Sequence, residues 1–173
     1  MKQQTIGKAV SAKGIGLHTG QTTSISIQPA PANHGVKFKR VDTEKHTLFM
    51  VDPNKVGSTQ RSTCLKNGEV TLSTVEHLLS AIAASPVDNV LIEVDGPEIP
   101  ILDGSCQEWL QLLKTAGTTE QEREKEFLVI EETLEFRDEE TGASFVALPH
   151  EDFSISALLE YDTAPLNLSL IHI

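Results

Sequence analysis

The sequence predicts an α+β fold: a two-layer sandwich in which helices cover one face of a sheet, followed by the opening of a second domain. Three observations support this fold class. Strand-like alternation of polar and apolar residues dominates the first 72 residues. Two helical patterns then flank an apolar strand between residues 74 and 117, and strand patterns return after a charged stretch that ends near residue 126.

The early strands are recognised by alternation and by the turns between them. Residues 22–28 and 35–41 alternate polar and apolar side chains, which predicts two strands. The proline-rich stretch between them, closed by Gly35, predicts a turn, because glycine accepts a positive φ without steric cost. Residues 60–72 predict a further strand pair, joined by a hairpin turn of the Asn-Gly kind at Gly68.

The first helix is predicted over residues 74–84. Ser73 and Glu76 have the spacing of a capping box, in which the serine oxygen accepts the N3 amide proton and the glutamate reaches back. A rotation of about 100° per residue gathers the apolar side chains on one arc of the helix. These side chains are Val75, Leu78, Leu79 and Ile82. Glu76 and His77 then lie on the opposite arc, away from the core that the helix covers.

A largely apolar strand is predicted next, at residues 89–95, followed by a connector at residues 96–100 that contains two prolines. A second helix begins at Ser105, where Ser105 and Glu108 again have the spacing of a capping box, and it ends near Gly117. The apolar residues of this helix are Trp109, Leu110, Leu112 and Leu113.

A polar and highly charged stretch at residues 118–126 is predicted to be a linker. Strand patterns resume after it, at residues 127–130, 143–148 and 153–158. The predicted domains are therefore residues 1–119, a complete α+β unit, and residues 127–173, the first strands of an incomplete second unit of similar type.

Composition limits the classes of function. The chain carries 14 basic and 25 acidic residues, and its net charge of −11 argues against a nucleic-acid or anionic-membrane partner, which needs clustered Lys and Arg. No stretch approaches the ~20 apolar residues that span a bilayer, and no signal peptide is recognised. Cys64 and Cys106 are far apart and outside any Cys-x-x-Cys pattern, so we expect free thiols in a reducing compartment. These features together predict a cytoplasmic protein.

The most informative feature is a carboxylate directly beside an imidazole, at Glu76 and His77. A metal hydrolase can use such a pair, with the imidazole binding an ion and the carboxylate handling protons. The alternative interpretation is structural: Glu76 caps the helix and His77 is a solvated residue of its polar face. Because a catalytic zinc needs about three protein ligands, spacing alone leaves both interpretations open.

Four short motifs occur along the chain, namely GLHTG at residues 16–20, PAPAN at 29–33, STVEHL at 73–78 and PEIPILDGS at 97–105. In their order and spacing they resemble the N-terminal domain of the LpxC family, the UDP-3-O-acyl-N-acetylglucosamine deacetylases of lipid A biosynthesis. The resemblance covers nearly all of residues 1–120. Residues 127–160 resemble the start of the second domain of that family.

The resemblance implies an enzymatic function. In that family, two α+β domains hold a catalytic zinc between them, and the acetamide of a UDP-linked acylated amino sugar is hydrolysed to release acetate. Carried over by motif, His77 is implied to bind the zinc, and Glu76 is implied to act as the general base. His18 and Asp103 match positions near the site and are given supporting roles.

Three residues that precede the first helix in the sequence also bear on the site. Ser62 and Thr63 are expected to line it, on family analogy. Cys64 could act as a soft zinc ligand, but its position in a strand pattern favours a buried small apolar residue.

The chain departs from the family in one respect. The family's remaining zinc ligands, a His and an Asp on an HKxxD-type segment, have no matching position here, and neither do its general-acid histidine and substrate-binding lysine. We therefore expect a fragment of a longer deacetylase that is inactive and binds zinc weakly by itself. In some relatives the longer protein is fused to an acyl-chain dehydratase. The alternative is a short noncatalytic protein that acts as an interaction module through its uncovered sheet or domain interface.

Overall fold

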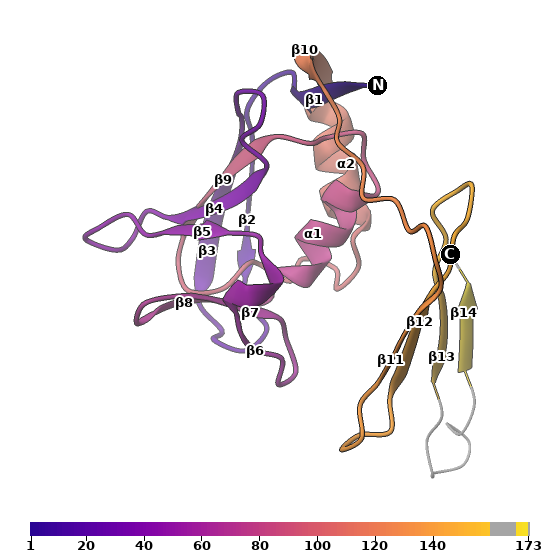
Figure 1. The fold of residues 1–173 in the computed structure, drawn as a ribbon. Coiled ribbons are helices and arrows are strands. Elements are labelled where there is room, and N and C mark those ends of the chain that lie inside the picture. Colours follow the sequence, from indigo (N-terminus) through magenta and orange to yellow (C-terminus); the bar gives the residue numbers. More distant parts are fainter. Residues whose placement is uncertain (160–168, 173) are drawn as a thin grey trace. The chain divides into compact units, whose positions relative to one another are not determined.

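The structure is a computed structural model, and it describes residues 1–159 and 169–172. Contacts divide the chain into two compact units, Met1–Lys125 and Glu126–Ile173. Figure 1 traces the helices and strands of each unit.

A five-stranded sheet forms the centre of the first unit, with the strand order β2-β3-β9-β4-β5. Its strands are β2 Val10–Ile15, β3 Thr22–Pro29, β4 Val36–Arg40, β5 Leu48–Met50 and β9 Val90–Asp95. Neighbours are antiparallel except for β4 and β9, which are parallel. The alternation predicted at residues 22–28 is confirmed, because Thr23, Ile25 and Ile27 are buried in β3 and the residues between them are more exposed.

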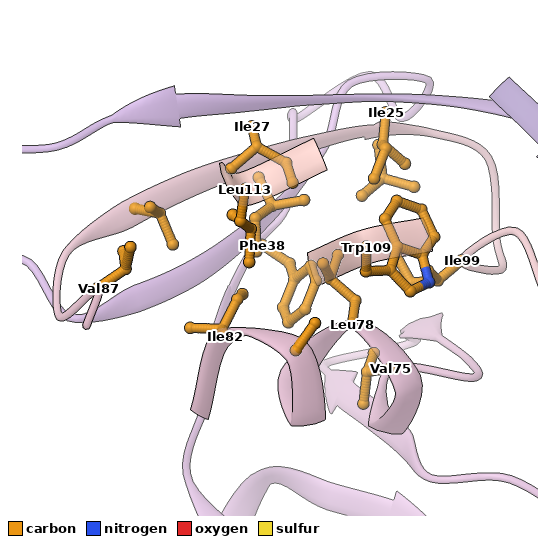
Figure 2. Packing of buried hydrophobic residues seen from close by; sticks show 14 of the residues in the cluster. Ile25, Ile27, Phe38, Val75, Leu78, Ile82, Val87, Ile99, Trp109 and Leu113 are labelled. Atoms are coloured by element: carbon orange, nitrogen blue, oxygen red, sulfur yellow. The ribbon is translucent and has the colours of Figure 1, made fainter. Parts of the chain in front are cut away.

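Two helices, α1 Glu76–Ala83 and α2 Gln107–Ala116, pack on one face of this sheet, which confirms the predicted α+β sandwich. Figure 2 shows buried side chains from the sheet and the helices meeting between the two layers. The cluster includes Ile25, Ile27, Phe38, Leu78, Ile82, Trp109 and Leu113. Burial of a large apolar side chain contributes about 1.5–3 kcal/mol, so this layer is a main source of stability for the helix that carries Glu76 and His77.

The starts of both helices differ from the prediction. Neither has a capping box, because the residues at the N-cap positions, Val75 and Cys106, make no side-chain cap. Ahead of α2, Ser105 Oγ instead accepts a hydrogen bond from the backbone amide of Gln107 at 3.0 Å. The predicted end of α2 is confirmed, because Gly117 follows it with a φ of 66°, a conformation that glycine adopts at low cost.

Two smaller sheets complete the first unit. One has the order β6-β7-β8 and follows the short helix η1 Pro53–Lys55; its strands are β6 Val56–Ser58, β7 Cys64–Asn67 and β8 Val70–Leu72. The hairpin turn predicted at Gly68 is confirmed, with a φ of 61° at that residue. The other sheet pairs β1 Lys2–Ile6 with β10 Thr118–Glu124 in antiparallel fashion.

The linker prediction for residues 118–126 was wrong, because most of this stretch forms β10. The side chains of β10 are mostly exposed, so its sequence has the polar character of a linker. A pair of strands, however, is held together by hydrogen bonds between backbone groups and does not need apolar side chains. Glu124 also lies 3.2 Å from Lys2 Nζ and 3.1 Å from the N-terminal amine of Met1.

The second unit contains two antiparallel pairs, β11 Leu134–Arg137 with β12 Ser144–Ala147 and β13 Ser156–Leu159 with β14 Ser169–His172. The strand predicted at residues 143–148 is confirmed, the one at 153–158 only in its second half, and the one at 127–130 was wrong. Phe136 and Phe145 face each other across the first pair, with ring centroids 6.2 Å apart, and both are exposed. Across the part of the chain that the structure describes, no helix has the length and apolar character needed to cross a membrane.

Candidate functional site

Glu76 and His77 are the first two residues of α1. Both side chains are half-buried, whereas Leu78 and Ile82 are buried in the core between helix and sheet. The predicted division of the helix into a core face and an open face is therefore confirmed. Among the residues that the structure describes, the His77 ring has no hydrogen-bond or ion-pair partner, so both of its nitrogens are available to a ligand.

The Glu76 carboxylate is held by the segment that leads into β7 and not by its own helix. Oε2 of Glu76 accepts a hydrogen bond from the backbone amide of Thr63 at 3.0 Å. The capping box predicted for Ser73 and Glu76 was wrong, because Thr74 has a φ of 61° and turns the chain between Ser73 and the helix. A left-handed turn at this point removes Ser73 from the N-cap position.

Thr63 contacts the start of the helix through its backbone. Besides donating to Glu76, it accepts a weak hydrogen bond from the backbone amide of Val75 at 3.4 Å. Ser62 and Cys64, its two neighbours, are half-buried, and Cys64 is a free thiol whose Sγ lies 3.7 Å from Ser73 Oγ. The structure thus brings Thr63 to the Glu76 carboxylate, as a backbone donor.

A second carboxylate, that of Glu98, binds Thr74 just ahead of the helix, and its role was not predicted. Glu98 is fully buried, with a relative exposure of 0%. Its Oε1 accepts hydrogen bonds from Thr74 Oγ1 at 2.9 Å and from the His18 amide at 3.0 Å, and its Oε2 accepts one from the Thr19 amide at 2.8 Å. The only sequence signal for this role is an acidic residue between two prolines, in a connector whose other residues are glycine and isoleucine.

These hydrogen bonds keep Glu98 ionised. Burial alone would raise the pKa of the carboxyl, but the amides of His18 and Thr19 and the hydroxyls of Thr19 and Thr74 outweigh burial, so its pKa lies below the usual value of 4.5. An ionised carboxylate with several donors is a strong acceptor, and it can fix the groups around it.

The GLHTG motif forms the loop that wraps around this carboxylate. The Gly20 amide donates to the Gly16 carbonyl at 3.0 Å, which closes the loop, and Gly20 has a φ of 65°. A Cβ on Gly16 would collide with the Glu98 carboxylate and would lie 2.6 Å from Thr19 Oγ1. Glycine is therefore required at position 16 for the loop to approach Glu98 so closely.

His18 and Asp103 reach the neighbourhood of the pair in different ways. The loop of His18 is joined to the residues before α1 through Glu98, while the His18 side chain is exposed. Asp103 is exposed in the turn before α2 and accepts hydrogen bonds from the amide and hydroxyl of Ser105. The Ser105 amide, followed by its hydroxyl, holds the pKa of Asp103 below its usual value. Asp103 thus has a structural partner in Ser105 and no hydrogen bond or ion pair with Glu76 or His77.

The PAPAN motif has a structural role elsewhere. Asn33 has a φ of 63°, and its Oδ1 accepts a hydrogen bond from Gln3 Nε2 at 2.8 Å. Gln3 in turn accepts a hydrogen bond from the buried Asn89, which also donates to Gln121. This polar cluster joins β1 and β10 to the start of β9 and contacts none of the candidate site residues.

The described residues do not form a complete metal site. Over residues 1–159 and 169–172, no three His, Cys, Asp or Glu side chains lie close enough together to hold a metal ion. A catalytic zinc needs about three protein ligands. The imidazole of His77 suits one ligand position, and the complete donor set for zinc is not present among these residues.

Comparison with a family model and comparison with curated proteins agree with each other. The family model described as UDP-3-O-acyl N-acetylglycosamine deacetylase matches residues 3–172. The bifunctional enzyme LpxC/FabZ of Bacteroides thetaiotaomicron is 44% identical over 163 residues, which are 94% of this chain and 35% of that protein. The UDP-3-O-acyl-N-acetylglucosamine deacetylase of Cellvibrio japonicus is 42% identical over 162 residues, 94% of this chain and 53% of that protein.

A third relative has a similar coverage. The UDP-3-O-acyl-N-acetylglucosamine deacetylase of Pseudoalteromonas atlantica is 37% identical over 173 residues, 99% of this chain and 56% of that protein. The chain therefore spans between about a third and about half of the length of the curated relatives it matches.

Proposed function

The chain belongs to the UDP-3-O-acyl N-acetylglycosamine deacetylase family, and from this premise we propose that it supplies half of the active site of a zinc-dependent deacetylase. The substrate is a UDP-linked, 3-O-acylated N-acetylglucosamine, the product is acetate, and the step belongs to lipid A biosynthesis. One observation carries the proposal: a carboxylate and an imidazole stand side by side at the open start of α1, with the imidazole unbonded among the described residues.

In this proposal His77 is one ligand of the zinc. The bound ion would polarise the amide carbonyl and lower the pKa of a water molecule. Glu76 is the general base that accepts a proton from water. Its Oε2 is held by the Thr63 amide, so the proton would be accepted at Oε1. The Thr63 contact orients the carboxylate without neutralising it. The loop of His18 is proposed to border the same site, and Ser62 and Asp103 keep the supporting roles that the family resemblance implies.

The chain alone is proposed to be inactive and to bind zinc weakly. Among the described residues, His77 is the one imidazole assigned to the metal, and no cluster of three potential ligands is found there, which supports this view. The relatives that carry the deacetylase name are longer than the matched region, and the remaining ligands are proposed to come from such additional sequence. Two relatives are named bifunctional LpxC/FabZ enzymes, which supports a fusion to an acyl-chain dehydratase in the longer protein. A cytoplasmic location stays a prediction.

A chimera tests the proposal. Residues 1–173 replace the matching segment of the Cellvibrio japonicus relative, and zinc content and acetate release are measured for the chimera and for the chain alone. We expect the chimera to hold roughly one equivalent of zinc and to release acetate, and the chain alone to do neither. In the chimera His77→Ala should remove zinc and activity, whereas His34→Ala, in a turn between β3 and β4, should remove neither. Acetate release by the chain alone, or an active zinc-loaded His77→Ala chimera, would contradict the proposal.

A further inference from the structure

Thr74 lies two residues before the first residue of α1, in an unfavourable backbone conformation. Its φ is 61°, and its side chain is β-branched and buried, with a relative exposure of 2%. A β-branched residue rarely adopts the left-handed region, because its Cβ substituents crowd the backbone. Such a conformation persists only where surrounding contacts hold it, and it is concentrated at functional sites.

The contacts that hold Thr74 come from one short segment, Pro97 to Ile99. The Thr74 hydroxyl donates to Glu98 Oε1 at 2.9 Å. On the preceding residue, the Ser73 amide donates to the Pro97 carbonyl and the Ser73 carbonyl accepts from the Ile99 amide, both at 3.0 Å. The backbone before Thr74 and the side chain of Thr74 are therefore fixed by the same segment, two residues ahead of Glu76.

We propose that Glu98 is a positioning residue for the Glu76–His77 pair. Its buried carboxylate holds Thr74 in the left-handed conformation that sets the direction of the first turn of α1, and it also binds the amides of His18 and Thr19. One buried group thereby fixes the two motifs that border the site relative to each other. The inference rests on the proposed function only in treating Glu76 and His77 as the reactive pair.

The negative charge of Glu98 is the property that this role needs. All of its partners are donors: two backbone amides and the hydroxyls of Thr19 and Thr74. A glutamine of the same shape offers one acceptor oxygen, and its NH₂ group would face donors. Glu98→Gln therefore removes hydrogen bonds at nearly constant volume, which makes it the informative substitution.

The test is an NMR comparison of the 173-residue chain with its Glu98→Gln variant. A positive φ brings the amide and α protons of a residue close together, so wild-type Thr74 should show a strong intraresidue NOE. In Glu98→Gln we expect this NOE to weaken, the amide resonances of Glu76 and His77 to shift, and amide exchange at His18 and Thr19 to accelerate about tenfold or more. Glu93→Gln, which removes the charge of a carboxylate bound by Lys39 and Gln28 on the sheet, should leave all of these signals unchanged.

A second pair of variants keeps the inference testable if Glu98→Gln does not fold. Thr74→Val removes only the hydroxyl and should shift the Glu76 and His77 amides, while Thr74→Ser keeps the hydroxyl and should leave them near their wild-type positions. Unchanged Glu76 and His77 resonances in both Glu98→Gln and Thr74→Val would overturn the inference. These readouts report backbone geometry, so they hold or fail independently of whether the site deacetylates a UDP-sugar.

Discussion

Oε2 of Glu76 accepts a 3.0 Å hydrogen bond from the backbone amide of Thr63. This contact ties the carboxylate of α1 to the segment that leads into β7, thirteen residues earlier in the chain. A carboxylate fixed by a backbone donor keeps its orientation without a cationic partner, which is the condition that a proposed general base requires. The orientation of the Glu76 carboxylate therefore depends on a contact between two elements, and not on the helix alone.

Close approach of the GLHTG loop to Glu98 predicts that Gly16→Ala is destabilising. The added Cβ would collide with the Glu98 carboxylate and with Thr19 Oγ1, so the loop must move or the carboxylate must lose donors. We expect a loss of about 1–3 kcal/mol in the free energy of unfolding, measured by urea denaturation. Gly20→Ala, which has open space but a φ of 65°, is the matched control and should cost only about 1 kcal/mol. A Gly16→Ala variant as stable as the wild type would rule out this packing.

Ionised Glu98 predicts a specific acid sensitivity. Its pKa in the folded state is lower than the usual value of 4.5, so the stability it contributes is fully present above that value and is lost as the pH falls through the folded-state pKa. The free energy of unfolding of the wild type should therefore fall between neutral pH and about pH 3 by more than that of Glu98→Gln. Asp42 and Asp103 have lowered pKa values as well, so both proteins lose stability. An equal loss in the two would contradict the assignment.

The buried amide of Asn89 predicts a large effect away from the candidate site. It donates to Gln3 and Gln121, and its Oδ1 accepts from the Gly35 amide at 2.7 Å. Asn89→Ala leaves these groups without partners in a buried setting, so we expect a loss of about 2–4 kcal/mol. Asn54→Ala, on the exposed helix η1, should change stability by less than about 0.5 kcal/mol. Urea unfolding of both variants measures the difference, and equal effects would show that the cluster does not hold β1 and β10.

The first unit is expected to fold by itself. Every residue of the buried apolar cluster lies between Ile6 and Ala116, and β10 ends at Glu124. A chain of residues 1–125 should therefore unfold cooperatively in urea, with a free energy within about 15% of that of the same unit in the full chain. Residues 126–159 expose many apolar side chains, among them Phe136 and Phe145, so binding of a hydrophobic dye should be lower for 1–125 than for the full chain. Failure of 1–125 to unfold cooperatively would refute its independence.

Local signals in the sequence were sufficient for much of the fold. Alternation at residues 22–28, the turn at Gly68 and the division of α1 into an apolar and a polar face depend on residues within a few positions of one another, and the structure confirms them. The adjacency of Glu76 and His77 is also a local fact, which is why the candidate site could be centred on them from the sequence.

Long-range contacts account for what the sequence did not predict. Glu98 binds amides 79 and 80 residues away and a hydroxyl 24 residues away, and no local pattern records such distances. The capping box failed for the same reason, because the left-handed turn at Thr74 is held by Glu98 and not by the helix. The polar, charged sequence of residues 118–126 predicts a linker, whereas the strand β10 forms by pairing with β1 at the other end of the unit, which no local pattern shows.

Acetate release by the chimera, compared between its wild-type and Glu76→Gln forms, tests the assigned chemistry most directly. The substitution preserves the shape of the side chain and its oxygen near the Thr63 amide, and it removes the ability to accept a proton. We predict that the rate falls by about 10²–10⁴-fold while zinc content and folding are unchanged. A Glu76→Gln rate within a few-fold of the wild type would contradict the assignment of Glu76 as the general base.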